Sequence, residues 1–271
     1  MTMVKNIFNS RAKYKKIRNY IHRLRYFFKY FGLSYYCPFC KKFLRKLLPR
    51  GVSSSIIKTN NIIGMGRRNC YCPFCFSTDK ERLLLLFLIT ETDIFNKKKF
   101  RKILHFAPEK NLGSILRSSN NLEYISADLY SKNVMIKMDV TDIKFEDDYF
   151  DVVICNHVLE HVPNDRKAIR EIYRVIKPGG WAILQVPISY SLKKTYEDPG
   201  IESSESRLRS FGQEDHLRIY GMDYIKRLEE VCFEVDIFDP ASRFGGLKIK
   251  RYGLFPGEKV FIARKRVMSK N

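Results

Sequence analysis

Five of the seven cysteines lie between positions 37 and 75, in two similar motifs. The first motif, CPFC, contains Cys37 and Cys40, and the second, CYCPFC, contains Cys70, Cys72 and Cys75. Two thiolates three residues apart can bind one tetrahedral ion, so two such pairs supply four ligands. The sequence therefore predicts a structural zinc site made by Cys37, Cys40, Cys72 and Cys75, because four thiolates leave no open position for chemistry.

The length of the connection between the two motifs leaves alternatives to the zinc site open. It spans residues 41–71, which is 31 positions, whereas zinc-binding pairs are usually separated by roughly 15–20. The alternative is that these cysteines form disulfides or remain unreactive thiols. The odd number of cysteines and a basic N-terminus without an apolar signal region weigh against disulfides. Cys70 is either a spare thiol or an alternative ligand.

A second group of reactive side chains follows short apolar runs. Asp128 ends the run ISAD, Asp139 follows MIKM, and Asn156 follows VVIC. Asp128 lies about 20 residues after the preceding turn, the spacing at which nucleotide-binding sheets place a carboxylate against a ribose diol. Three histidines are candidate general bases for a reaction that removes a proton, namely His157, His161 and His216.

The hydrophobic pattern predicts a scaffold that brings these residues together. Helical periods, the clearest over Asp165–Ile176, alternate with short apolar runs. This alternation predicts an α/β protein with a mostly parallel sheet, whose ligands bind beyond the carboxyl ends of its strands. The seven predicted strands are Lys102–Phe106, Leu122–Ser126, Val134–Lys137, Phe150–Asn156, Trp181–Pro187, Phe233–Phe238 and Lys259–Ala263.

Charge and cysteine content divide the chain further. Residues 1–78 hold 17 Lys and Arg and no Asp or Glu, whereas the remainder holds 33 basic and 29 acidic residues. We predict a basic helical lead over 1–35, a cysteine-rich module over 36–78 and the sheet domain over 79–271. The basic segment predicts an anionic partner, which could be RNA, a phosphorylated substrate or a membrane surface. The longest apolar run, Leu83–Ile89, is too short to predict a transmembrane segment.

One long motif resembles a known family. The run FEDDYFDVVICNHVLEHVPNDRKAIREIYRVIKPGGWAILQVP resembles the core signature of the class I S-adenosylmethionine (SAM)-dependent methyltransferases of the type 11-like kind, and the resemblance covers about residues 102–265. With CPFCFSTDKERLLLLFL before LHFAPE and FGQEDHLRIYG after the sheet, the layout is similar to a subgroup with an N-terminal zinc-ribbon-like module. The resemblance implies a Rossmann-like, seven-stranded, doubly wound sheet and SAM as cofactor.

The resemblance also implies a cofactor site in the turn after the first strand. His105, Phe106, Ala107 and Glu109 would wrap the methionine part of SAM. The family's turn is usually glycine-rich, often D-x-G-x-G-x-G, whereas here His105 replaces the acid and Ala107 and Glu109 occupy glycine positions. The backbone approach to the ligand is then tighter on one side. Glu109 would offset this by pairing with the ammonium group of SAM.

Further roles are implied at the next strand ends. Asp128 would bind the ribose hydroxyls, and Asp139 with the backbone at Val140 would meet the adenine amino group. Asn156 and His157 would border the reactive methyl group and its acceptor. All of these residues are expected at one rim of the sheet.

The segment FGQEDHLRIYG supplies the candidate acceptor contacts, Arg218 and Tyr220. The alternative is a capped loop in which Arg218 pairs with Asp215 or Glu197. The polar stretch over residues 196–210 is interpreted as a lid that closes over bound ligand.

The expected function is therefore SAM-dependent methyl transfer in the cytoplasm, including its membrane surface. The nearly balanced charge of the sheet domain slightly favours a small molecule or a glycan- or lipid-linked precursor as the unidentified acceptor. RNA methylation is the alternative, favoured by the basic, aromatic first 78 residues. A non-catalytic, zinc-dependent module that binds nucleic acid or protein is a third hypothesis, supported by the altered first turn.

Overall fold

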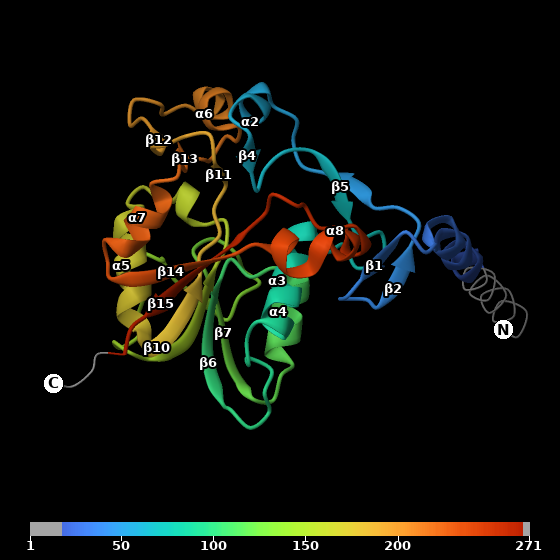
Figure 1. Cartoon of the computed structure of the whole chain (residues 1–271), viewed down its shortest axis with the longest axis horizontal. Coiled ribbons are helices and arrows are strands. Elements are labelled where there is room, and N and C mark those ends of the chain that lie inside the picture. Colours follow the sequence, from blue (N-terminus) through green and yellow to red (C-terminus); the bar gives the residue numbers. More distant parts are fainter. Residues whose placement is uncertain (1–17, 268–271) are drawn as a thin grey trace, which may run out of the picture.

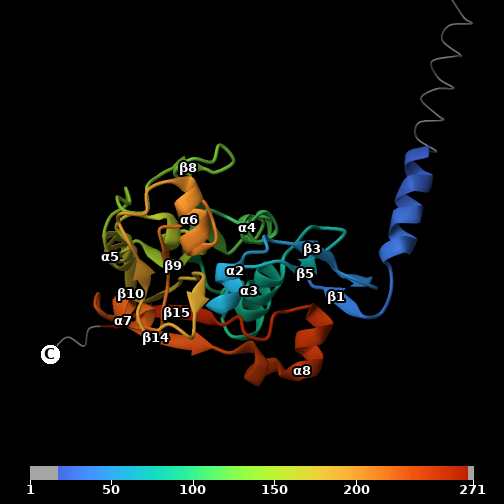
Figure 2. The same cartoon turned by 90° about the horizontal axis from the view of Figure 1, so that it is seen from above.

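A computed structural model describes residues 18–267 of the chain. Residues 18–30 form a helix that extends away from the rest of the molecule (Figures 1 and 2). The rings of Tyr26 and Phe27 pack against Phe74 at centroid separations of 6.1 and 5.8 Å, which joins this helix to the cysteine-rich region. The predicted basic lead is thus helical over residues 18–30, and its residues 1–17 lie outside the described range.

Short antiparallel strand pairs build the cysteine-rich region. β1 (Tyr35–Cys37) pairs with β2 (Lys42–Leu44), and β3 (Leu48–Arg50) pairs with β5 (Arg68–Tyr71). The connection between them contains α2 (Ser55–Thr59) and β4 (Ile62–Ile63). Because β4 pairs with β11 (Ile188–Ser189), the connection lies against the sheet domain, and the limits drawn at 36 and 78 stay a prediction.

Seven strands form the central sheet in the order β14-β15-β10-β9-β6-β7-β8. β15 runs antiparallel to both neighbours, and the other pairs of this sheet are parallel. This confirms the prediction of a mostly parallel, seven-stranded sheet. The strands are β6 (Arg101–Phe106), β7 (Leu122–Asp128), β8 (Ile136–Lys137), β9 (Phe150–Cys155), β10 (Ile176–Ile183), β14 (Phe233–Phe238) and β15 (Val260–Lys265).

The predicted bounds differ most at β10 and β8. β10 begins at Ile176, because Ile176 already pairs with Phe150 before an irregularity that ends at Trp181. The Lys-Pro-Gly-Gly sequence therefore lies inside the strand as a bulge. β8 is shorter than predicted, because only Ile136 and Lys137 pair with β7.

Helices cover both faces of this sheet, as the alternating strand residues require. Leu104 and Val153 belong to a core cluster with α5 (Asp165–Val175) and α7 (Tyr224–Glu229). Ile103 and Val152 belong to a second cluster with α3 (Asp79–Thr90), α4 (Lys110–Arg117) and α8 (Pro240–Tyr252). The two groups of helices lie on opposite sides of the strands in Figure 1. Among residues 18–267, no helix combines the length and apolar content needed to cross a bilayer.

Smaller elements complete the rim where the carboxyl ends of the strands lie. They are η1 (Leu159–His161), β12 (Tyr196–Glu197), α6 (Ser204–Phe211) and β13 (Arg218–Ile219). β7 and β8 lie on one side of β6, whereas β9 and β10 lie on the other. The ends of β6 and β9 therefore flank the point at which strand order reverses, where sheets of this kind bind ligands.

A buried arginine joins the cysteine-rich region to the sheet domain. Arg82 on α3 is fully buried and donates to the carbonyl oxygens of Ser77 at 2.9 Å, Cys70 at 3.0 Å, Tyr252 at 2.7 Å and Gly253 at 2.9 Å. Gly253 has a φ of 59°, and a Cβ there would lie 2.4 Å from a methyl group of Leu47 and 3.3 Å from the guanidinium. Glycine therefore permits this close approach of the two segments.

Replacing Arg82 with methionine tests this connection. The Arg82→Met change removes the guanidinium donor from four carbonyl oxygens, of which that of Ser77 keeps the Cys72 amide as a donor. Each carbonyl left unsatisfied costs roughly 1–3 kcal/mol. We expect the apparent free energy of unfolding in urea to fall by at least about 3 kcal/mol. The matched control is Arg243→Met, which removes an exposed ion pair with Glu91 and is expected to cost no more than about 1 kcal/mol. Equal unfolding curves for both variants would contradict the assigned role of Arg82.

Candidate active site

A cavity of about 840 Å³ lies at the carboxyl ends of β6, β7 and β9. Its lining includes Phe106 and Ala107 from the first turn, Asp128 from the end of β7, and Asp139 and Val140. The structure therefore brings together five residues that the sequence places on three separate strand ends.

Ala107 makes the first turn possible without glycine. Its φ is 45°, in the left-handed region that glycine usually fills. The neighbouring His105 is buried, and its ring lies 3.2 Å from the Tyr124 hydroxyl and 2.8 Å from a carboxylate oxygen of Glu109. The Asn156 amide donates to the other Glu109 oxygen at 3.1 Å. Burial opposes ionisation of Glu109, but the contacts with His105 and Asn156 outweigh it and hold the Glu109 pKa below its usual value.

The two aspartates are held in place by the backbone. One oxygen of Asp128 accepts from the amides of Tyr130 and Ser131, both at 2.7 Å. One oxygen of Asp139 accepts from the amide of Thr141 at 2.8 Å. These bonds use Oδ1 of each carboxylate, so the Oδ2 atoms are the ones available to a ligand in the cavity.

His157 connects this cavity to a second one. It follows Asn156 at the end of β9 with a φ of 54°, and it lines both cavities. Its Nε2 lies 3.0 Å from the ammonium of Lys80, and its Nδ1 lies 3.3 Å from a carboxylate oxygen of Glu160. The imidazole is therefore oriented from both ends.

The second cavity, of about 580 Å³, lies between the cysteine-rich region and the rim of the sheet. Gly64 and Arg68 line it from one side, and Glu109, Asn156 and His157 line it from the other. Arg68 is not free for a ligand, because it lies 2.6 Å from Asp79 and 3.8 Å from Glu258. The cysteine-rich region thus contributes part of the wall beside the catalytic candidates.

Glu160, His161 and His216 form a cluster at the edge of the larger cavity. Their candidate metal-binding atoms lie within 4.8 Å of one another. Glu160 and His216 are buried, whereas His161 is partly exposed. Burial lowers the pKa of His216 to about 4. Burial opposes ionisation of Glu160, but the His157 contact and the nearby histidines hold its pKa below the usual value.

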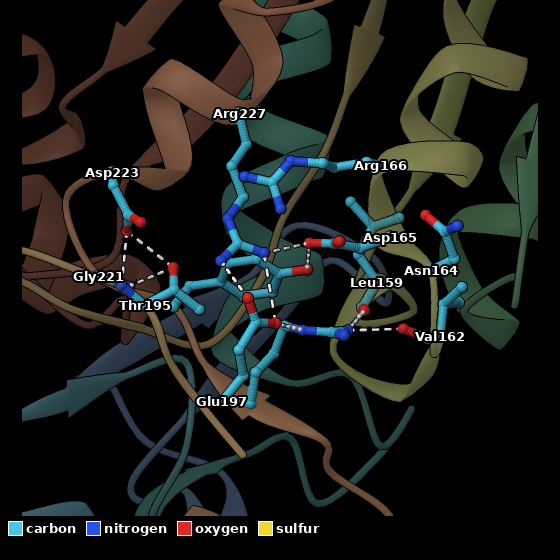
Figure 3. A network of polar contacts seen from close by, with 12 residues as sticks. Leu159, Val162, Asn164, Asp165, Arg166, Thr195, Glu197, Gly221, Asp223 and Arg227 are labelled. Carbon is cyan, nitrogen blue, oxygen red and sulfur yellow. Dashed lines mark hydrogen bonds and ion pairs between the residues drawn. The ribbon is translucent and has the colours of Figure 1, made fainter. Parts of the chain in front are cut away.

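Two arginines, Arg218 and Arg227, anchor the loop that carries Glu160 and His161, and Figure 3 labels Arg227 in this network. Arg218 donates to the carbonyl oxygens of Leu159 at 2.9 Å and Val162 at 2.6 Å, and pairs with Glu197 at 2.8 Å. Arg227 bridges Glu197 at 2.7 Å and the buried Asp165 at 2.8 Å. Arg218, Arg227 and Asp165 are all buried, which makes this a network inside the protein rather than a surface ion pair.

The predicted acceptor contacts belong to the same network. Arg218 also donates to the Pro163 carbonyl at 3.0 Å, and Tyr220 donates to Asp165 at 2.8 Å. Burial raises the pKa of Tyr220 well above its usual value. In this structure both polar groups bind other parts of the protein, and their contact with an acceptor stays a prediction. Glu197 is the Arg218 partner that the sequence allowed, and it anchors the segment interpreted as a lid.

The four predicted zinc ligands meet at one point. The Cys37 and Cys75 sulfurs lie 3.5 Å apart, and those of Cys40 and Cys72 lie 3.8 Å apart. Zn–S bonds of about 2.3 Å place the sulfurs of a tetrahedral site about 3.8 Å apart. The donor set therefore fits a zinc ion. Cys70 is outside this group of four.

Part of the chain that builds this site matches a known protein family. Residues 106–184 match the methyltransferase domain family. This stretch, which is less than a third of the chain, is similar to methyltransferase domains. It contains the first turn, both aspartates and the loop from Asn156 to His161.

Among curated relatives, the "Ubiquinone/menaquinone biosynthesis C-methyltransferase UbiE" of Vibrio campbellii is 35% identical over 65 residues, which is 23% of this chain and 25% of that protein. The "Phosphoethanolamine N-methyltransferase 2" of Caenorhabditis elegans is 24% identical over 153 residues, which is 55% of this chain and 30% of that protein. The chain thus spans about a quarter of the length of the first curated relatives it matches. A solved SAM-dependent methyltransferase from Archaeoglobus fulgidus superimposes with a TM-score of 0.44 and 17% sequence identity, covering 68% of this chain and 94% of that one.

Sequence reasoning missed two parts of this site. One is the wall that Gly64 and Lys80 add, because nothing in the local pattern predicts that the cysteine-rich region lies against β9. The other is the approach of His216 to Glu160, which depends on the bond from the Leu217 amide to the Glu160 carbonyl at 2.9 Å. The only signal for the latter was the density of polar residues around His216.

Zinc content gives a direct test of the cysteine cluster. We expect about one equivalent of zinc in the purified chain and a loss of most of it in Cys40→Ser, because a hydroxyl replaces one of four thiolates. The matched control is Cys70→Ser, which alters a nearby buried cysteine and is expected to retain the metal. Elemental analysis after gel filtration measures both. Equal zinc in both variants, or less than about half an equivalent in the parent chain, would contradict the four-thiolate site.

Proposed function

We propose that this chain is a SAM-dependent methyltransferase that acts on a small molecule or a lipid- or glycan-linked precursor. The observation that carries the proposal is the shared position of His157. This residue lines both the cavity that holds Asp128 and Asp139 and the cavity beside Glu109 and Asn156. A cofactor molecule that extends from the larger cavity into the smaller one would have its middle part beside His157.

The residues present suit the two ends of SAM. The free Oδ2 of Asp128 would accept from the ribose hydroxyls, and Asp139 with the Val140 backbone would meet the adenine. Glu109 is ionised under ordinary conditions, because its pKa is held low, and its carboxylate would attract the ammonium of the methionine part. SAM supplies an activated methyl group, so alignment of the acceptor provides much of the rate.

His157 has the position of a group that acts on the acceptor. It is held between Lys80 and Glu160 at 3.0 and 3.3 Å, so its ring has little freedom to turn. An acceptor hydroxyl or ammonium would need to lose a proton. Nε2 of His157 would receive it when the acceptor takes the place of the Lys80 ammonium, which contacts that atom in this structure. His161 and His216 lie farther along the same rim and remain candidates for the same role.

The size of the smaller cavity supports a small acceptor. This cavity, of about 580 Å³, is bounded by the cysteine-rich region on one side and the rim of the sheet on the other. The names of the curated relatives refer to a quinone C-methyltransferase and a phosphoethanolamine N-methyltransferase. Both names describe small acceptors, in line with the acceptor class proposed here.

The basic helix over residues 18–30 supports a lipid-linked precursor in particular. Its exposed apolar side chains recur every three or four positions, at Tyr20, Leu24, Phe28 and Phe31, and basic residues lie between them. A basic helix with an apolar stripe suits the surface of an anionic membrane. RNA methylation through base stacking on the same aromatic residues is the alternative.

A binding measurement tests the cofactor assignment. Asp128→Asn keeps the oxygen that accepts from the loop and replaces the other oxygen with a donor. We expect SAM affinity in calorimetry to fall by about 1.5–3 kcal/mol, or roughly 10–150-fold. Asp142→Asn is the matched control, since Asp142 is exposed and pairs with Lys144. An unchanged SAM affinity in Asp128→Asn would refute the ribose assignment.

A labelling experiment tests the acceptor class. The zinc-loaded chain is incubated with SAM carrying a radioactive methyl group and with cell extract separated into small-molecule, lipid, RNA and protein fractions. We expect label in the small-molecule or lipid fraction, and much less with Asp128→Asn at limiting SAM. Label in RNA would establish the alternative instead. Saturable SAM binding with no label in any fraction would favour the non-catalytic hypothesis.

A further inference from the structure

Two buried polar atoms beside the larger cavity lack a partner. Within residues 18–267, neither Oε2 of Glu160 nor Nδ1 of His216 has a hydrogen-bond partner, although both atoms are buried. Glu160 is 1% exposed and His216 is 2% exposed. A buried carboxylate oxygen without a donor is costly, and so is a buried ring nitrogen. The arrangement therefore needs a further positively charged or donating group.

His161, the third member of the cluster, is oriented so that one ring nitrogen can bind a cation. Nδ1 of His161 lies 3.1 Å from the carbonyl oxygen of Asp215 and 3.2 Å from its carboxylate. A proton on Nδ1 would be donated to these oxygens, which leaves Nε2 with its lone pair. Metal-binding histidines characteristically donate one ring N–H to a carboxylate or carbonyl in this way. The His161 and His216 rings lie edge to face with centroids 4.7 Å apart.

We infer that Glu160, His161 and His216 bind a divalent first-row transition-metal cation. Two imidazoles and one carboxylate within 4.8 Å of one another form a ligand set that leaves coordination positions open. The cation would neutralise the unpaired oxygen of Glu160. This site differs from the four-cysteine cluster in its place and in its ligand type. Four thiolates suit zinc, whereas a ligand set that includes a carboxylate also suits manganese.

A ligand of the cation would approach from the larger cavity, because His161 and Asp215 line it. Oxygen ligands, either water or an oxygen of the acceptor, suit those positions. The second of these roles rests on the proposed methyltransferase function. An acceptor that presents a hydroxyl or carboxylate would then be held beside His157. The cation site itself does not depend on that role.

Two features of the fold hold the ligands in place without a metal. The amide of Leu217 donates to the carbonyl of Glu160 at 2.9 Å, which joins the segment of His216 to the η1 loop. Arg218 binds the carbonyls of Leu159 and Val162 on either side of Glu160 and His161. The site is therefore largely formed in advance, and binding requires only small adjustments of side chains.

Manganese is the probe that tests this inference. The chain holding one equivalent of zinc, the amount that the four cysteines are expected to bind, is titrated with Mn²⁺ alone, and free Mn²⁺ is measured by electron paramagnetic resonance in the absence of SAM. We expect one saturable site per chain. Affinity should fall at least about tenfold in His161→Ala, a partly exposed position, and in Glu160→Gln, which conserves volume. His22→Ala is the matched control, because His22 is exposed on the N-terminal helix.

The outcomes separate this inference from the proposed function. Absence of saturable Mn²⁺ binding to the parent chain would overturn the cation site, and so would unchanged affinity in either variant. Circular dichroism confirms that each variant is folded before titration. SAM binding is measured by calorimetry on the same preparation, so that a chain able to bind SAM but not Mn²⁺ refutes the cation site alone.

Discussion

The burial of Arg218 and Arg227 with only two carboxylates is the constraint on which the site depends. A buried charge is stable only when it is paired. Removal of one partner leaves an unpaired charge inside the protein, which strongly destabilises the fold. Glu197 and Asp165 pair with the two guanidinium groups, and backbone carbonyls of the η1 loop accept further hydrogen bonds from Arg218. The loop that carries Glu160 and His161 therefore has one conformation that satisfies the network. The chemistry at the rim is positioned by this requirement rather than by the loop's own preferences.

A second constraint fixes the opposite wall of the site. Arg82 joins the carbonyls of Cys70 and Ser77 in the cysteine-rich region to those of Tyr252 and Gly253 at the end of α8. Lys80, two residues earlier on α3, reaches His157 at 3.0 Å. The cysteine cluster, the helix and the imidazole are thus connected through a few residues of one helix. This explains how a small module without reactive groups of its own contributes to the surroundings of His157.

Much of the fold could be predicted because it follows from local patterns. Continuous apolar runs and helical periods located all seven strands of the sheet, and strand ends placed Asp128 and Asp139 at one rim. The cysteine spacing predicted which four sulfurs meet. The contacts that could not be predicted join distant segments. Nothing near His216 in the sequence indicates that it approaches Glu160, 56 positions earlier, because that approach depends on how β13 packs against η1. The bounds of β10 also depended on tertiary pairing, since Ile176 is held by Phe150.

The arginine on α3 also implies an order of events during synthesis. Tyr252 and Gly253 leave the ribosome 170 and 171 positions after Arg82. The nascent chain therefore presents both pairs of thiols to the cellular metal supply while half of the arginine's acceptors do not yet exist. The four thiols can therefore bind a metal before Arg82 has all of its acceptors. α8, which is synthesised much later, then packs against a cysteine-rich region that is already assembled.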